Sequence, residues 1–257
     1  MVGESQSAPL RLLNPLPSFP QTREKNASPK VLNLVNFRVV ELVEAFTLWH
    51  PNYFFRKVVV LSNFPCMVCV MCVDGKLHVC TTEDKNWNIM DLDYNETRYR
   101  DIIIHKGHVY ILDSKGTIFW IDPSSLKLVQ YSPSRYSDYG FRKEMVECNG
   151  SLYVVDIIHI QVLHIQERKF EACIEVYKLD EEWGRWENVK NLGDVLFVLG
   201  NNYNFSLSAQ DYYGCKGNCI YFAFRNTILC FSLEDSKLEL HNPLWPCPTL
   251  FNPKFNL

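Results

Sequence analysis

Two cysteines in the stretch GCKGNC are the first feature of this chain that could do chemistry. Cys215 and Cys219 bracket a Lys-Gly-Asn, and this spacing suits a metal knuckle, a redox pair or the tip of a β-hairpin. A structural zinc site takes four ligands, so two more would have to come from elsewhere in the chain. Because alternating apolar residues follow, we interpret the bracket as the tip of a hairpin.

A second run, C-x-x-C-x-x-C, contains Cys66, Cys69 and Cys72. A metal knuckle needs a turn between its cysteines, whereas CMVCVMCV has the pattern of a continuous strand. Since side chains alternate between the two faces of a strand, Cys66 and Cys72 would face one side and Cys69 the other. We therefore predict packing roles for all three. The minor alternative is a ligand role at the start of the strand, next to Pro65.

Four histidines lie near predicted strands or turns. His105 and His108 straddle a turn, and neither has an acidic residue at a spacing typical of a site; the other two are His159 and His164. We expect all four to be satisfied within the fold or exposed, and not to bind a metal.

The acidic pairs Glu181-Glu182 and Asp91/Asp93 have the pattern of acidic turns or solvated faces. The sequence contains no nucleophile elbow, phosphate-binding loop, dinucleotide fingerprint or H-E-x-x-H helix. We therefore predict no catalytic, cofactor-binding or metal-binding residue, no cofactor and no enzyme activity.

The composition indicates a globular chain rich in β-structure. Aromatic residues make up 14% of the 257 residues, and they favour pleated, half-buried surfaces. The net charge of −3 gives no field for nucleic acid, and no apolar run approaches the roughly 20 residues of a membrane span. The N-terminus has no signal-peptide pattern, and most of the ten cysteines lie in apolar runs. We expect reduced thiols, a cytoplasmic or nuclear location, and neither nucleic acid nor membrane as a partner.

The elements that would position these residues are strands, because one hairpin pattern occurs four times. Each time an apolar strand is followed by a turn that contains glycine and then by a second strand; an Asp-Gly or Asn-Gly turn between such strands is a strong hairpin signal. The turns are Asp74-Gly75, Lys106-Gly107, Asn149-Gly150 and Lys216-Gly217.

Further strands and turns follow each hairpin, which predicts units of four short strands. This repetition is typical of an all-β fold, a β-propeller of four-stranded antiparallel blades, with a β-sandwich as the alternative. Trp87, Trp120 and Trp186 would fill the spaces between blades. The units lie near 57–93, 97–131, 140–191 and 193–241.

The N-terminal part of the chain is less clear. Residues 1–30, rich in Pro and Ser, are expected to be a poorly patterned lead-in, and 31–257 the propeller domain. Residues 31–50 fit a strand or a short helix, with a weak preference for the helix.

Five segments carry a family resemblance: LRLLNPLPSFP, KVVVLS, HKGHVYILDSKGTIFWID, WENVKNLGD and GCKGNCIYF. Together they resemble a plant domain, DUF295, also called the KIB1-4 β-propeller domain. The similarity spans nearly all of residues 9–248. Its most specific part runs from Trp186 to Phe222 and includes the Leu192-Gly193-Asp194 step.

The resemblance implies a kelch-like propeller. In that family the domain usually follows an F-box, which binds Skp1, and presents substrates to a Skp1–cullin–F-box (SCF) ubiquitin ligase. Residues 1–8 cannot hold an F-box, so we expect the F-box to be absent, which puts Skp1 binding in doubt. We also expect the lead-in to hold the remnant of a truncated first blade, with the propeller incomplete at the N-terminus.

The leading hypothesis is thus a non-enzymatic protein-interaction propeller with an unknown partner and unknown partner-binding residues. The alternatives are a propeller-based hydrolase or a non-functional truncated paralogue. The insertion Ile157–Cys173 is a candidate binding loop, although a lengthened hairpin between second and third strands is the favoured interpretation.

Overall fold

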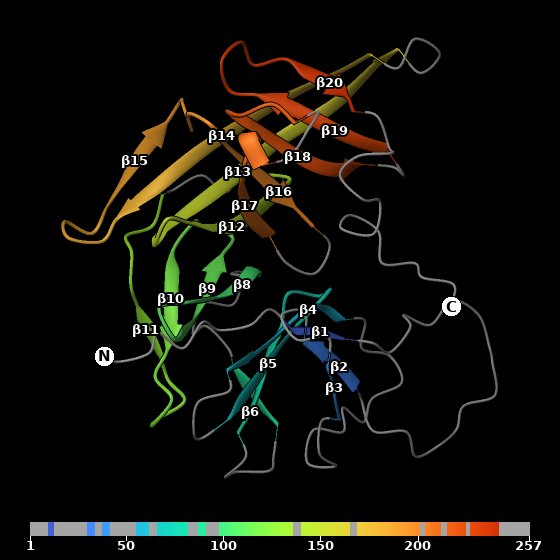
Figure 1. The fold of residues 1–257 in the computed structure, drawn as a ribbon. Helices are drawn as coiled ribbons and strands as arrows, with labels where there is room; N and C mark the ends of the chain where they lie inside the picture. The colour runs from blue at the N-terminus through green and yellow to red at the C-terminus, as the bar shows by residue number, and fades with distance from the viewer. Residues whose placement is uncertain are drawn as a thin grey trace.

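The computed structural model describes residues 10–12, 30–33, 38–41, 55–61, 66–81, 87–90, 98–135, 140–164, 169–200, 204–211, 215–224 and 227–241. These residues form strands joined by turns, with a single turn of 3₁₀ helix, η2 (Ala209–Asp211). Figure 1 shows the sheets following one another around the molecule in chain order. The predicted fold class, an all-β propeller, is confirmed; its kelch-like character stays a prediction.

Three blades have four antiparallel strands each, paired in chain order. The first consists of β4 (Phe55–Leu61), β5 (Met67–Cys72), β6 (Leu77–Thr81) and β7 (Asn88–Met90). The next consists of β8 (Tyr99–His105), β9 (His108–Asp113), β10 (Ile118–Ile121) and β11 (Leu128–Gln130). The third consists of β12 (Arg142–Cys148), β13 (Ser151–His164), β14 (Lys169–Asp180) and β15 (Arg185–Val189).

The fourth blade has five strands in the order β17-β16-β18-β19-β20. Its strands are β16 (Val195–Leu199), β17 (Asn204–Ser208), β18 (Cys219–Phe224), β19 (Thr227–Ser232) and β20 (Leu238–Leu240). Strand β16 lies between β17 and β18, antiparallel to the first and parallel to the second. Strands β4, β8, β12 and β17 are the inner strands of their blades, and successive ones contact each other.

The hairpin predicted at Cys215 and Cys219 is therefore wrong. The chain that contains Lys216-Gly217 does not turn between paired strands, because β16 separates β17 from β18. Gly217 is needed for another reason: a Cβ there would lie 2.8 Å from the carbonyl oxygen of Gly193 and 2.9 Å from Cα of Asp194. The glycine lets two backbone segments approach each other where the chain enters this blade.

The other glycine turns do join paired strands. Lys106-Gly107 and Asn149-Gly150 have positive φ at both residues, as a type I′ turn requires. At Asp74-Gly75 only the glycine has a positive φ, of 82°.

A three-stranded sheet forms from the N-terminal part of the chain. It pairs β1 (Leu10–Leu12) with β2 (Lys30–Asn33), and β2 with β3 (Arg38–Glu41). The weakly preferred helix over 31–50 is wrong for the described part of that segment, where β-branched residues pair as strands. The predicted division of the chain at residue 30 stays a prediction.

The insertion Ile157–Cys173 is the lengthened hairpin that the sequence favoured. Strands β13 and β14 pair along it, with register shifts near Ile157 and Val162, and residues 165–168 at its tip lie outside the described residues. Figure 1 shows this ribbon extending past β18, β19 and β20. Ala172 and Ile174 on it belong to the same hydrophobic cluster as side chains of β16, β18 and β19.

The core lies between blades, as a propeller requires. One cluster joins the β4–β7 and β8–β11 blades, a second joins β8–β11 to β12–β15, and a third joins β12–β15 to β16–β20. Trp120 and Trp186 pack against the second cluster and Trp87 against the β4–β7 blade. Stacking of blades therefore buries the faces that no single blade could cover.

Candidate functional site

One polar side chain from each inner strand meets its counterparts where these strands lie side by side. Lys57 comes from β4, Asp101 from β8, Glu144 from β12 and Asn204 from β17, and all four are buried. We call these four residues the inner-strand network. It is the most concentrated group of buried charges among the described residues, at the position where propellers often hold a site.

Asp101 is the centre of this network. Its Oδ1 accepts hydrogen bonds from Nζ of Lys57 at 2.5 Å and from the backbone N–H of Ile102 at 2.8 Å. Its Oδ2 accepts from the backbone N–H of Met145 at 2.6 Å and from Nδ2 of Asn204 at 3.1 Å. Three blades thus converge on one carboxylate of the β8–β11 blade.

Glu144 is held in a similar way. Its Oε1 accepts from Arg56 at 2.9 Å and from Nε of Arg142 at 2.5 Å, and its Oε2 accepts from Nδ2 of Asn204 at 2.9 Å. Arg142 also donates to the carbonyl oxygen of Gly200 at 3.2 Å. Every carboxylate oxygen of the network therefore has a donor.

The two carboxylates have opposite pKa shifts. Burial raises the pKa of Asp101 to about 6; the ammonium of Lys57 opposes this rise and the charge of Glu144 adds to it. Burial also acts to raise the pKa of Glu144, but Arg142, Arg56 and Lys57 outweigh it and lower that pKa to about 2. Both groups are ionised at neutral pH.

These contacts make the network a clamp between blades. A general base needs a free lone pair directed at its substrate, and the carboxylates of Asp101 and Glu144 already accept from protein donors. Within the network, the buried acceptor without a donor is Oδ1 of Asn204, which is neutral and not nucleophilic.

Sequence reasoning missed this network, although a signal existed. Asp101 and Glu144 each stand six positions before the glycine of the following hairpin, Gly107 and Gly150. Like Lys57, each directly precedes the apolar run of an inner strand. A charged residue at one fixed position of a repeated buried strand indicates a shared role.

The predicted split of the first cysteine run is confirmed. Cys69 packs in the cluster between the β4–β7 and β8–β11 blades, whereas Cys66 and Cys72 belong to the cluster on the opposite face of β5. Burial raises the pKa of Cys72 to about 11 and raises that of Cys69 further. These side chains act as small apolar groups.

Cys219 lies in β18, and its thiol is hydrogen-bonded to Cys230 of β19. That hydrogen bond is the main cause of a raised pKa of Cys219, and burial is the second cause. The same hydrogen bond lowers the pKa of Cys230. Cys215 is half-buried and packs against the hydrophobic cluster that contains Cys219 and Cys230. Within the described part of the chain, no three His, Cys, Asp or Glu side chains gather as metal ligands would.

His105 is satisfied within the fold, as expected, and its partners are acidic residues distant in the sequence. Its ring is fully buried, with Nε2 lying 3.2 Å from Glu181 and Nδ1 lying 3.4 Å from Glu147. Both carboxylates come from the β12–β15 blade, so no local spacing could reveal them. Glu181 also accepts from Lys106 at 2.5 Å and from the hydroxyl of Tyr131 at 3.0 Å.

Among the described residues, His108 and His159 belong to no group of metal-ligating side chains. His108 packs edge-on against Trp120, with ring centroids 5.2 Å apart, and His159 is exposed opposite Cys173. The side chain of His164, like the pair Asp91/Asp93, lies outside the described residues.

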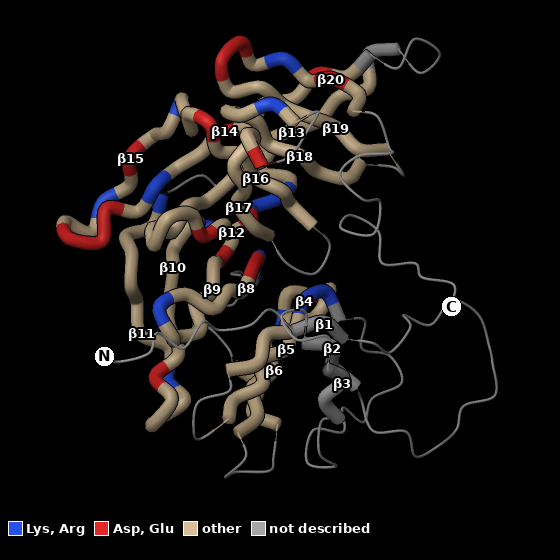
Figure 2. The backbone as a smooth tube through the Cα atoms, viewed as in Figure 1, with Lys and Arg blue, Asp and Glu red and all other residues tan. Residues whose placement is uncertain are grey.

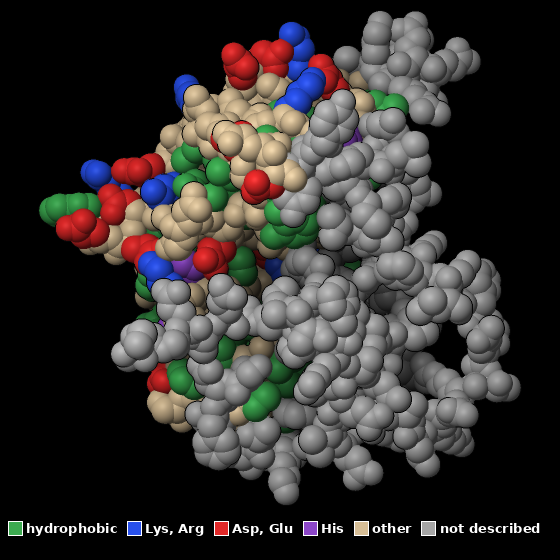
Figure 3. All heavy atoms as spheres, viewed as in Figure 1, with side chains coloured by type: hydrophobic (Ala, Val, Ile, Leu, Met, Phe, Trp, Pro, Cys, Tyr) green, Lys and Arg blue, Asp and Glu red, His purple; other side chains and the backbone are tan. Residues whose placement is uncertain are grey.

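The turn between β14 and β15 projects from the described surface. Glu181 and Glu182 lie in it, as predicted for an acidic turn, and Trp183 at its tip is 71% exposed. Figure 2 shows acidic residues gathered on this turn, and Figure 3 shows acidic and hydrophobic atoms together where it protrudes. An exposed tryptophan of this kind is typical of a protein contact.

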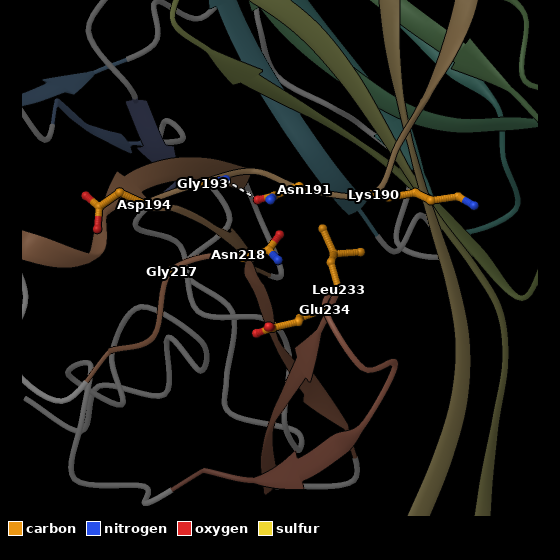
Figure 4. Close-up of a pocket in the computed structure, with 8 residues that line it drawn as sticks. All are labelled: Lys190, Asn191, Gly193, Asp194, Gly217, Asn218, Leu233 and Glu234. Atoms are coloured by element: carbon orange, nitrogen blue, oxygen red, sulfur yellow. Dashed lines mark hydrogen bonds between the residues drawn. The ribbon is translucent and has the colours of Figure 1, made fainter.

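A shallow hollow of about 710 Å³ lies where the chain enters the last blade (Figure 4). It is lined by Lys190, Asn191, Gly193, Asp194, Gly217, Asn218, Leu233 and Glu234. Asn218 shapes it, since its side-chain oxygen accepts from the backbone N–H of Leu192 at 2.8 Å. The Leu192-Gly193-Asp194 step and residues 215–219, the described part of GCKGNC, both carried the family resemblance and thus form a structural joint.

No helix among the described residues has the length and apolar character of a membrane span.

Comparison with known proteins gives consistent matches. A family model described as the KIB1-4 β-propeller matches residues 1–243. F-box protein At2g26160 of Arabidopsis thaliana is 30% identical over 237 residues, which cover 85% of this chain and 70% of that protein. F-box protein At4g35733 of the same plant is 30% identical over 253 residues, 90% of this chain and 67% of that protein. Putative F-box protein At1g65770, also from Arabidopsis thaliana, is 28% identical over 267 residues, 97% of this chain and 72% of that protein.

Proposed function

Because this chain belongs to the KIB1-4 β-propeller family, as the resemblance predicted, we propose that it is a non-enzymatic protein-interaction module. It resembles the substrate-recognition part of plant SCF F-box proteins. Its rigid blades would present turns to a protein partner, a common use of such scaffolds.

One observation carries the non-enzymatic part of this proposal. The buried polar groups at the inner strands bind one another, so that Lys57, Asp101 and Glu144 hold blades together. A hydrolase would instead need a nucleophile or base open to a substrate. Neither the hydrolase nor the truncated paralogue has a specific feature of the described residues in its favour.

The test is affinity purification of the tagged chain from plant cells, followed by mass spectrometry for Skp1, cullin and other partners. Enrichment of Skp1 and cullin would connect the chain to the ligase, and the other co-purified proteins would become substrate candidates. A reproducible partner without Skp1 would support a free-standing interaction module. Repeated purification without any specific partner would contradict the proposal, and profiling with fluorogenic esters and glycosides would then test the hydrolase.

A further inference from the structure

The outer edge of the β12–β15 blade differs from the other outer edges. Strand β15 pairs with β14 on one side and is the last strand of its sheet. It has five residues, whereas β7, β11 and β20 have three each. Proteins usually keep free edges short, because unpaired backbone groups invite another strand. Among the described blades, β15 is thus the longest outer edge.

The turn before this edge presents Trp183 in a fixed position. The Oδ1 of Asp180 accepts from the backbone N–H groups of Glu182 and Trp183, both at 3.2 Å, and Oδ2 accepts from Nε of Arg185 at 3.2 Å. Contacts of Glu181 with the β8–β11 blade secure the turn from the other side. The backbone of the turn is therefore fixed while the tryptophan side chain is exposed, so binding a partner would cost little further conformational entropy in the turn.

The charges around this tryptophan are mainly acidic. Asp180 pairs with Arg185, Glu181 pairs with Lys106, and Glu187 on β15 lies beside Arg185 and opposite Lys178 of β14. Trp186, between Arg185 and Glu187, turns inward and donates to the carbonyl oxygen of Pro133 at 3.0 Å. The exposed Glu182 thus carries the surplus negative charge next to the ring of Trp183.

We propose that β15 and Trp183 receive an extended, arginine- or lysine-rich segment of a protein partner, which adds to the sheet as a further strand. The free edge supplies the backbone groups, as in other cases of β-strand addition. Basic side chains of the segment pair with Glu182 and Glu187, and one stacks on Trp183 as a cation–π contact. This inference rests on the proposed function and names the chemistry of the partner.

The probe is a fluorescein-labelled peptide of alternating arginine and valine, measured by fluorescence anisotropy at low salt. Two matched peptides accompany it, one with glutamate in place of arginine and one with alternate backbone amides N-methylated. We expect the first peptide to bind, the glutamate peptide not to bind, and N-methylation to weaken binding about tenfold or more because the ladder hydrogen bonds are lost.

Variants of the protein locate the site. Trp183→Ala should weaken peptide binding about fivefold or more, as the loss of an interface anchor does. Glu187→Lys should weaken it about tenfold, whereas Glu234→Lys, the same charge change on an exposed residue of another blade, should stay within about twofold. All these residues are exposed, and circular dichroism checks that each variant is folded.

Three results would overturn the proposal. Equal losses of peptide affinity for Glu187→Lys and Glu234→Lys would mean that the peptide is attracted by the overall charge of the protein and not by this edge. Unchanged binding of the N-methylated peptide would exclude strand addition. A dimer in light scattering that Glu187→Lys dissociates would show that a second copy of this chain covers the edge.

Capture from plant cells separates this inference from the proposed function. A partner retained by the wild type and lost with Trp183→Ala supports both. A partner retained equally by both proteins leaves the interaction function standing and removes the β15 site. If the wild type retains no partner, the proposed function fails, whatever the peptides show.

Discussion

At the scale of single residues, the inner-strand network is where a small change has the largest effect. Lys57 neutralises Asp101 at 2.5 Å in a buried position. Removing one partner of a buried ion pair leaves an uncompensated charge, which is far more damaging than replacing both partners.

We predict that Lys57→Met destabilises the fold by about 3–5 kcal/mol. The matched control is Lys106→Met, which removes an ammonium that pairs with Glu181 at the surface and should change stability by about 1 kcal/mol or less. Urea unfolding followed by tryptophan fluorescence measures both. Equal effects of the two substitutions would mean that the network contributes no more than a surface pair.

Acid stability should depend on Glu144. Its pKa is lowered from 4.5 in an ordinary setting to about 2, so its contribution is present above pH 4.5 and is lost as the pH falls toward 2. Asp101 has the opposite sign: its pKa is raised from 3.8 to about 6, so its contribution is complete below pH 3.8 and is lost as the pH rises through 6. The two groups must therefore be separated by a variant.

We predict that the difference in unfolding free energy between wild type and Glu144→Gln is constant above about pH 7 and shrinks as the pH falls from about 4.5 toward 2. Between these ranges the difference also includes the altered titration of Asp101, whose pKa Glu144 helps to raise. Urea unfolding at a series of pH values provides the measurement. A difference independent of pH across this range would show that the carboxylate of Glu144 is not specially stabilised in the folded protein.

At the scale of elements, the joint that leads into β16 shows how far sequence reasoning reaches. The strands of the first three blades and the turns at Lys106-Gly107 and Asn149-Gly150 follow from local pattern, because a hairpin pairs neighbours in the sequence. The insertion of β16 between β17 and β18 does not, since the choice of neighbour depends on packing across the blade. The sequence pattern marks Gly217 as a hairpin-turn residue, whereas the structure requires glycine there because two backbone segments approach closely.

We predict that Gly217→Asn destabilises the protein by about 1–3 kcal/mol, because any Cβ there meets backbone atoms of 193–194 that cannot rotate away. Gly150→Asn is the control. Its φ of +72° is tolerated by asparagine and no atom lies within 4 Å of the added Cβ, so it should cost less than about 1 kcal/mol. Urea midpoints compare the two, and a larger loss for Gly150→Asn would contradict this account of the joint.

Some features of the candidate sites likewise follow from local sequence pattern, and others depend on contacts between blades. The opposite faces of Cys66 and Cys69 follow from the period of a strand, and the exposure of Glu182 follows from its place in a turn. The carboxylates around His105 come from another blade, and the four members of the inner-strand network come from four blades. Contacts between residues of different blades depend on how the blades pack against each other, and the local sequence pattern carries no information about that packing.

At the scale of the whole molecule, the clusters between blades and the network across the inner strands should make unfolding cooperative. We predict that far-ultraviolet circular dichroism and tryptophan fluorescence report the same urea midpoint, because no described blade keeps its buried faces once its neighbours leave. Two separate midpoints would show instead that the blades unfold one at a time.

The position of Asn204 has a consequence for the newly made chain. Its side chain donates to Asp101 at 3.1 Å and to Glu144 at 2.9 Å, across 103 and 60 positions of sequence. While translation proceeds from the N-terminus, these two carboxylates are synthesised well before their common amide donor. Until Asn204 leaves the ribosome, the earlier blades can form their hairpins but lack the hydrogen bonds from this amide. During that period the nascent chain is only partly folded and can bind chaperones. Completion of the blade that begins at β16 ends that period and completes the inner-strand network.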